Sequence, residues 1–181
     1  VGQIQEMLRS DLEFVAVHPM AGREGSGIVM SEGVAFDQAN YIIVPTACNT
    51  DEGLAAAKKL GEILGFAQIA ELDVDTHDEM IAYLSQLTHC IAVALMTCRD
   101  CEHMTAYTGD SFRDLTRIAR INDEMWSELF LLNKEKLLAQ MDLFIDEITR
   151  MRDLLKKGDR EGLRDMMRRS TARRALFDKP V

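Results

Sequence analysis

Three histidines and one arginine stand in surroundings that apolar packing does not explain. His18 follows the apolar run FVAV and precedes a glycine-rich loop. His77 and His89 belong to a long apolar segment, and Arg117 lies in the stretch SFRDLTRIAR. A histidine with a pKa near neutrality can accept a proton, and an arginine can bind a carboxylate through two parallel hydrogen bonds. This set suits redox or acid–base chemistry on a small carboxylate.

Each of these histidines also has a plainer interpretation. A single histidine on an apolar face is more often a hydrogen-bonded core residue than a catalytic group. His18 is the most suggestive, because the carboxyl end of a strand before a glycine-rich loop is where open α/β sheets place ligands. The combination favours a functional site, and the chain must supply elements that bring these residues together.

The cysteines do not predict a metal centre. The stretch CRDCEH (98–103) contains one C-x-x-C pair and a nearby His103. A structural zinc site needs four ligands, usually from two such pairs, and the second pair is absent from the sequence. We therefore expect no bound metal and reduced thiols, and the role of Cys98 and Cys101 stays open.

The charge is negative overall and uneven along the chain. Lys and Arg number 21 against 30 Asp and Glu, which gives a net charge of −9. An acidic body argues against a nucleic-acid partner. The basic RRSTARR near the end is typical of a solvated helix face, although it could bind an anion. The start lacks a signal-peptide pattern, and we expect no apolar stretch long enough to cross a membrane, hence a soluble, cytoplasmic protein.

The first 75 residues alternate between strand-like and helix-like stretches. The predicted strands are FVAV (14–17), YIIVPT (41–46) and AQIAELD (67–73). Between the last two, residues 51–65 carry apolar side chains at helical spacing, and Gly65 suits the end of a helix. Strand, helix and strand in this order predict a βαβ unit within a sheet covered by helices.

After Asp75 the pattern predicts helices only. THDE (76–79) resembles a capping box in which Thr76 caps the helix. The apolar run that follows, up to about residue 97, is apolar on nearly every side, which predicts a buried helix. Further helices are expected at 112–120, 123–132, 134–157 and 160–175, with Asn122, Asn133 and Gly158–Asp159 as caps or stops.

One of these helices carries an apolar seam. Its members recur at alternating intervals of four and three residues: Leu137, Met141, Phe144, Ile148, Met151 and Leu155. This is the a/d pattern of helices that pack side by side. The seam could belong to an ordinary bundle core, but beside an apolar helix it favours a contact between two copies, and we expect a homodimer.

Three blocks of sequence, in order, resemble the signatures of prephenate dehydrogenases. They are HPMAGREGSG, HDEMIAYLSQLTH, and SFRDLTRIA followed by MW. The resemblance implies oxidative decarboxylation of prephenate to 4-hydroxyphenylpyruvate in tyrosine biosynthesis, with NAD or NADP. It also implies an α+β protein in which residues 1–75 form the distal part of an α/β dinucleotide-binding domain. Residues 76–181 would form an all-helical dimerisation and substrate-binding domain.

The resemblance also implies roles for individual residues. His18 matches the catalytic histidine, which forms a hydrogen bond with the ring hydroxyl of the substrate. His89 matches a substrate-binding histidine, and Arg117 matches the arginine that holds a substrate carboxylate. Trp126 matches an aromatic residue at the site, and Glu24 matches a glutamate in an ionic network at its entrance. His77 matches a recurrent histidine of the family, for which we expect no direct contact with substrate.

The sequence departs from the family pattern at informative places. It contains no G-x-G-x-x-G, so the nucleotide fingerprint is expected upstream of Val1, the cofactor-binding residues are unknown, and the isolated chain is expected to be inactive. Gln86 stands where the family often has a histidine, and Asp110-Ser111 replaces a common Gly-Gly pair.

Two other functions remain open from the sequence. One is a helical dimerisation or small-acid-sensing module without catalysis. His18 argues against it, since a sensor needs no base at that position. The other is an arogenate dehydrogenase, whose substrate differs only in its side chain.

Overall fold

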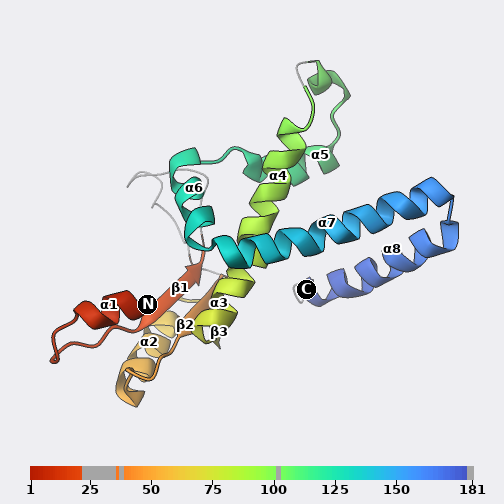
Figure 1. Cartoon of the computed structure of the whole chain (residues 1–181). Helices are drawn as coiled ribbons and strands as arrows, with labels where there is room; N and C mark the ends of the chain where they lie inside the picture. Colours follow the sequence, from red (N-terminus) through yellow and green to blue (C-terminus); the bar gives the residue numbers. More distant parts are fainter. Residues whose placement is uncertain (22–35, 37–38, 101–102, 179–181) are drawn as a thin grey trace. The chain divides into compact units, whose positions relative to one another are not determined.

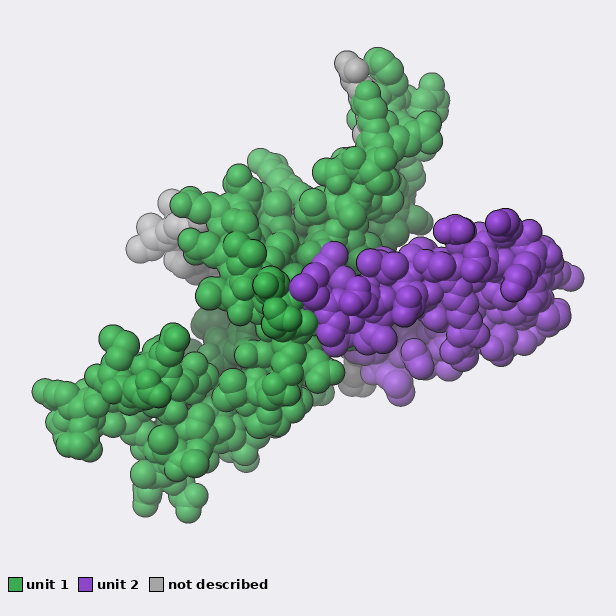
Figure 2. All heavy atoms as spheres, viewed as in Figure 1, with its two compact units in different colours: residues 1–137 green, residues 138–181 purple. Residues whose placement is uncertain are grey.

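The computed structural model describes residues 1–21, 36, 39–100 and 103–178. These residues form an α+β fold: a small mixed sheet with helices, followed by a wholly helical region (Figure 1). The fold class predicted from the sequence is therefore confirmed. The chain divides into two compact units, residues 1–137 and 138–181 (Figure 2).

The sheet has three strands in the order β1-β2-β3. Strands β2 (Asn40–Val44) and β3 (Gln68–Glu71) are parallel and are joined by helix α2 (Asp51–Ile63), which confirms the βαβ unit. Strand β1 (Ala16–Met20) pairs with β2 in antiparallel orientation. The first strand predicted over 14–17 began and ended too early: His18 lies inside β1, opposite Ile42, rather than after its end.

The core of this part lies between the sheet and α2. It is built from the buried Tyr41, Ile43, Ala57 and Phe66. Helix α2 begins at the N-cap Thr50, whose hydroxyl accepts a hydrogen bond from the amide of Gly53. It ends before Gly65, whose φ of +81° belongs to the left-handed region that favours glycine. A short helix, α1 (Gly2–Met7), precedes the sheet and was not predicted.

A continuous helix follows the sheet, made of α3 (Val74–Ile81), the π-helical segment η2 (Ala82–Gln86) and α4 (Leu87–Thr97). Its N-cap is Asp73, whose carboxylate accepts hydrogen bonds from the amide and the hydroxyl of Thr76. The predicted capping box at Thr76 was therefore wrong, because the stronger acceptor lies three residues earlier.

This helix is only partly buried within the single chain, and its burial in a dimer stays a prediction. Buried positions include Ala82, Leu87 and Ala92, whereas Tyr83 and Leu84 are about half exposed. By length and composition alone Val74–Thr97 could cross a membrane, which corrects the expectation that no stretch would be long enough. The core helix of a soluble protein passes the same test, and an apolar helix left uncovered in one chain requires cover from elsewhere.

The rest of the first unit is built from short helices. These are η3 (Met104–Tyr107), α5 (Asp110–Thr116), η4 (Arg117–Ala119) and α6 (Asp123–Leu132). The helix predicted over 112–120 is instead divided, because α5 ends at Thr116 and a tighter 3₁₀ turn begins at Arg117. Helix α6 has the predicted bounds, and Asn122 caps it by accepting from the amide of Met125.

Helix α7 (Lys134–Lys157) has the predicted bounds and runs from the first unit into the second. It ends at Gly158, whose φ is +68°, and Asp159 then caps α8 (Arg160–Arg174). A last turn, η5 (Ala175–Phe177), follows. The seam predicted on α7 is partly open: Ile148 and Leu155 are 49% and 62% exposed, so this apolar face is not covered by the chain itself.

Candidate active site

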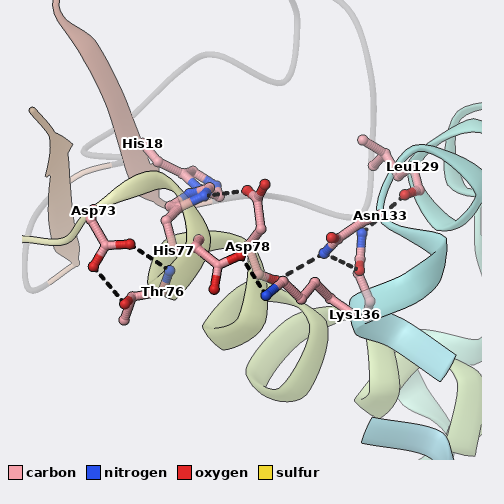
Figure 3. Close-up of polar contacts among 10 residues, drawn as sticks. His18, Asp73, Thr76, His77, Asp78, Leu129, Asn133 and Lys136 are labelled. Carbon is pink, nitrogen blue, oxygen red and sulfur yellow. Dashed lines mark hydrogen bonds and ion pairs between the residues drawn. The ribbon is translucent and has the colours of Figure 1, made fainter. Parts of the chain in front are cut away.

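Two histidines and a carboxylate form a hydrogen-bonded chain where β1 meets α3. The Nδ1 atom of His18 lies 2.9 Å from Nε2 of His77, and Nδ1 of His77 lies 2.8 Å from Oδ1 of Asp78 (Figure 3). The two rings are tilted by 57°, with centroids 5.2 Å apart. The register of β1 aims His18 at the first turn of α3, and the Asp73 cap fixes that turn.

The surroundings of His18 favour the neutral ring. Burial, and then the nearby His77, lower the pKa of His18 below its ordinary value of 6.5. The side chain of His77 is only 18% exposed, whereas that of Asp78 is 48% exposed. An imidazole that is neutral at neutral pH can accept a proton. The hydrogen bonds from His18 through His77 to Asp78 lead from a partly buried ring to the solvent.

A lysine from α7 neutralises part of the acidic first turn of α3. Nζ of Lys136 lies 2.6 Å from Oδ1 of Asp75 (Figure 3). The pKa of Lys136 is raised, chiefly by its hydrogen bond to Asp75 and to a smaller extent by the charges of Glu79 and Asp78. This ion pair joins the start of α7 to the element that carries His77.

His89 and Trp126 form a second pair. Their rings stack with centroids 3.7 Å apart and an interplanar angle of 28°. Nδ1 of His89 lies 2.9 Å from the carbonyl oxygen of Ser85, which can only accept, so Nδ1 carries the proton. The neutral ring then presents Nε2 as an acceptor. The structure thus brings together two residues that the sequence analysis assigned to substrate binding.

An amide pair, made of the buried Gln86 and the partly buried Asn133, connects the elements that carry these rings. Gln86 is 4% exposed, and its Nε2 donates to the carbonyl of Leu129 on α6. Nδ2 of Asn133 donates to Oε1 of Gln86 and to the backbone carbonyl of Asp78 (Figure 3). Asn133 is the C-cap residue of α6, as predicted, and its side chain also links the helix 74–97 to the α6–α7 junction.

Arg117 and Glu24 complete the predicted set. Arg117 is exposed and begins η4, which packs against α4, the helix of His89. Its neighbour Arg113 is engaged elsewhere, because it forms an ion pair with Asp110 at 2.6 Å. Glu24 lies outside the described residues. Along the helix, His77 and His89 are twelve residues apart, or roughly 18 Å at 1.5 Å per residue, so the two histidine groups are distinct.

The described residues offer neither a metal site nor a clear place for a nucleotide pyrophosphate. Within residues 1–21, 36, 39–100 and 103–178, no cluster of three or more His, Cys, Asp or Glu could hold a metal ion. The N-terminus of α2 is the place where a βαβ unit would offer amides to a phosphate. There the carboxylate of Glu13 already accepts from the amide and the hydroxyl of Thr50. A phosphate would meet a carboxylate, so this helix end does not fit a nucleotide pyrophosphate.

Sequence reasoning did not assign a contact to His77, and it overlooked Asp78. A signal was present: His77 and Asp78 are adjacent, three or more residues after a capping carboxylate, in the first turn of an apolar helix. Polar residues at the start of such a helix need partners, but nothing in the local sequence identifies His18 as the partner 59 positions away.

Comparison with known proteins matches two family profiles in succession along the chain. The profile described as "Prephenate dehydrogenase, nucleotide-binding domain" matches residues 1–69, and that described as "Prephenate dehydrogenase, dimerization domain" matches residues 73–169. A nucleotide-binding sheet followed by a helical dimerisation domain defines a class of two-domain oxidoreductases. Because the second profile alone covers more than half of the 181 residues, the chain belongs to the prephenate dehydrogenase family.

Individual relatives agree with this assignment. The chain is 30% identical over 170 residues to the prephenate dehydrogenase of Bacillus subtilis (strain 168), which covers 90% of this chain and 45% of that protein. It is 28% identical over 169 residues to the cyclohexadienyl dehydrogenase of Zymomonas mobilis, covering 90% and 57%. The chain thus spans about half the length of these curated relatives.

A solved structure extends the likeness to the fold. The crystal structure of prephenate dehydrogenase from A. aeolicus, in complex with hydroxyphenyl propionate and NAD+, has a TM-score of 0.81 at 27% identity. The match covers 91% of this chain and 59% of that one.

Proposed function

We propose that the protein containing this chain catalyses the oxidative decarboxylation of prephenate to 4-hydroxyphenylpyruvate, a step of tyrosine biosynthesis, as a cytoplasmic homodimer. The observation that carries the proposal is the ordered match of both family domains along the chain. We assign residues 1–75 to the distal part of the nucleotide-binding domain and residues 76–181 to the helical dimerisation and substrate-binding domain.

In this proposal His18 is the general base, acting through Nε2. Its Nδ1 is engaged by His77, so Nε2 is the ring atom left to meet a substrate. As hydride leaves the carbinol carbon, the hydroxyl on that carbon becomes acidic, and a neutral imidazole within hydrogen-bond reach can take its proton. The lowered pKa of His18 supports this role, because the ring is neutral at the pH where it must accept.

The remaining step needs no further group from the protein. When the bond to the ring carboxylate breaks, its electron pair enters the ring and CO₂ departs. The ring becomes aromatic, and the proton held at Nε2 of His18 can return to the phenolate oxygen. Proton and electrons therefore balance, with hydride as the only species that leaves with the cofactor.

Substrate binding is assigned to His89, Trp126, Arg117 and Glu24. Trp126 holds the ring of His89 by stacking, and the free Nε2 of that ring can accept a hydrogen bond from the substrate or, when protonated, donate to a carboxylate. Arg117 offers a planar guanidinium that suits a carboxylate. Glu24 is proposed, by family resemblance, to join the ionic network at the entrance.

NAD or NADP is proposed as the hydride acceptor, which is the chemistry that a nicotinamide supplies. The cofactor-binding residues stay unassigned, because the sequence contains no G-x-G-x-x-G and Glu13 occupies the N-terminus of α2. That the isolated chain of 181 residues is inactive stays a prediction.

The proposal is tested by supplying the full-length protein with prephenate and either nucleotide. The expected result is formation of 4-hydroxyphenylpyruvate, CO₂ and reduced nucleotide in equal amounts. A parallel assay with arogenate distinguishes the neighbouring activity through the ratio of kcat/KM values. Absence of turnover with both substrates and both nucleotides would refute the proposed function.

A further inference from the structure

The hydrogen bonds around His77 determine where its proton lies. An ionised carboxylate has acceptors only, so Nδ1 of His77, 2.8 Å from Oδ1 of Asp78, must carry a hydrogen. In the neutral ring Nε2 is then an acceptor. The same atom lies 2.9 Å from Nδ1 of His18, which must therefore donate. One carboxylate thus sets the tautomers of two rings in succession.

We propose that His77 and Asp78 are positioning residues that hold His18 in the tautomer with its proton on Nδ1 and its lone pair on Nε2. This inference rests on the function proposed for His18. In the other tautomer Nε2 would carry the hydrogen, and His18 could not accept a proton from a substrate hydroxyl. The pair also orients the ring, since His18 can keep its hydrogen bond only in one ring position.

The same hydrogen bonds among His18, His77 and Asp78 stabilise the product of proton transfer. When Nε2 of His18 accepts the substrate proton, the ring becomes a cation that donates more strongly from Nδ1 to His77. His77 in turn donates more strongly to the carboxylate of Asp78, so the positive charge is met by a negative one through two hydrogen bonds. In catalytic triads a carboxylate orients the histidine base and stabilises its cation. Here Asp78 acts in the same way on His18, with the ring of His77 between them.

The surroundings show how Asp78 is kept in place. Its backbone carbonyl accepts from Asn133, and its side chain is half exposed, so its charge is hydrated as well as paired. Among the residues that the structure describes, the charged neighbours in this region are Asp75 and Glu79 on α3 and Lys136 on α7. Because Lys136 pairs directly with Asp75, the carboxylate of Asp78 remains available to His77.

The tautomers can be measured without any turnover. In the chain labelled with ¹⁵N-histidine, the ring-nitrogen chemical shifts above the pKa of His18 should place the proton of His18 on Nδ1. The variant His77→Phe should populate both tautomers of His18, whereas His77→Gln, whose amide oxygen can accept from Nδ1, should restore the first. An unchanged Nδ1–H tautomer in both His77→Phe and His77→Gln would overturn the proposal.

Kinetics in the full-length protein provide the second readout. His77→Phe should lower kcat about ten- to a hundred-fold with little change in KM, the range typical of groups that orient a functional ligand or base. His77→Gln should recover part of that loss, and Asp78→Asn should fall between them, because it keeps an acceptor but removes the charge. The matched control is His103→Gln, which changes an exposed histidine outside the His18–His77–Asp78 hydrogen bonds. This variant should retain wild-type kcat.

The outcomes separate this inference from the proposed function. If His18→Asn abolishes turnover while His77→Phe and Asp78→Asn leave kcat and the tautomer unchanged, the function stands and the inference fails. If His18→Asn retains normal kcat, the proposed function itself fails. Should His77→Phe not fold, Asp78→Asn and His77→Gln decide the question with the same two measurements.

Discussion

The amide pair of Gln86 and Asn133 gives a sharp prediction about stability. Asn133→Ala removes two hydrogen bonds, of 2.9 Å to the carbonyl of Asp78 and 3.0 Å to Oε1 of Gln86. The carbonyl of Asp78 keeps a partner in the backbone amide of Ala82. Oε1 of Gln86, in contrast, would lose the partner that Asn133 supplies, and Gln86 is only 4% exposed.

The expected cost follows from that difference. A buried acceptor left without a partner costs about 1–3 kcal/mol, and the second hydrogen bond adds about 1 kcal/mol, so the free energy of unfolding should fall by about 2–4 kcal/mol. For a chain of this length, each kcal/mol corresponds to a Tm shift of about 2–4 °C. Asn133→Ala should therefore lower Tm by about 4–16 °C.

The assay can use the only tryptophan in the chain. Trp126 stacks on His89, and its helix α6 is tied to Gln86 through the carbonyl of Leu129, so its fluorescence reports on this region during a thermal melt. Asn122→Ala is the matched control, because it removes an exposed helix cap and should cost about 1 kcal/mol. Equal Tm values for the two variants would refute the reasoning that a buried, unsatisfied amide dominates.

Two further predictions concern substrate and assembly. Arg117→Gln should raise KM for prephenate roughly ten- to a hundred-fold, because a charge-assisted pair is worth about 1.5–3 kcal/mol. The KM for the nucleotide should change little. Small, equal effects on both KM values would contradict a carboxylate-binding role. The folded chain should sediment as a dimer at micromolar concentration. The variant Ile148→Glu, on the exposed seam of α7, should shift it toward monomer, whereas Asp142→Asn, at an exposed position, should not. A monomeric wild-type chain would contradict a dimer interface on the helices.

Local signals in the sequence predicted much of the fold. Helices α6 and α7 have the expected bounds, because capping residues and glycines act within one turn of the backbone. Gly65 and Gly158 end their helices with positive φ, as the pattern indicated. The βαβ order followed from β-branched and aromatic runs on either side of a segment with apolar residues at helical spacing.

The misjudged elements have physical reasons. A histidine followed by Pro19 looks like the end of a strand, yet β1 continues to Met20. β1 lies at the edge of the described sheet, where a residue without an amide hydrogen is tolerated. The apolar helix 74–97 was expected to be buried. Its composition indicates only that its apolar surface must be covered, and not whether the same chain or a second copy covers it.

The functional roles of the candidate site residues stay predictions, and their connections could not be predicted from the sequence. His18, His89, Arg117 and Trp126 were selected from the sequence, and the structure joins His89 to Trp126. The contact of His18 with His77 depends on how a strand and a helix far apart in sequence pack. No spacing rule within either segment encodes that contact.

The most direct test of the account is the pH profile of kcat/KM for wild type and His18→Asn in the full-length protein. The lowered pKa of His18 means that the base is protonated, and activity lost, only as the pH falls below the ordinary histidine value of 6.5. Wild type should therefore hold its activity at pH 7 and lose it along an acid limb below 6.5. His18→Asn should lose about 10²–10⁴-fold in kcat and show no such limb. Near-normal kcat in His18→Asn, or the same acid limb in both proteins, would contradict the assignment of His18 as the base.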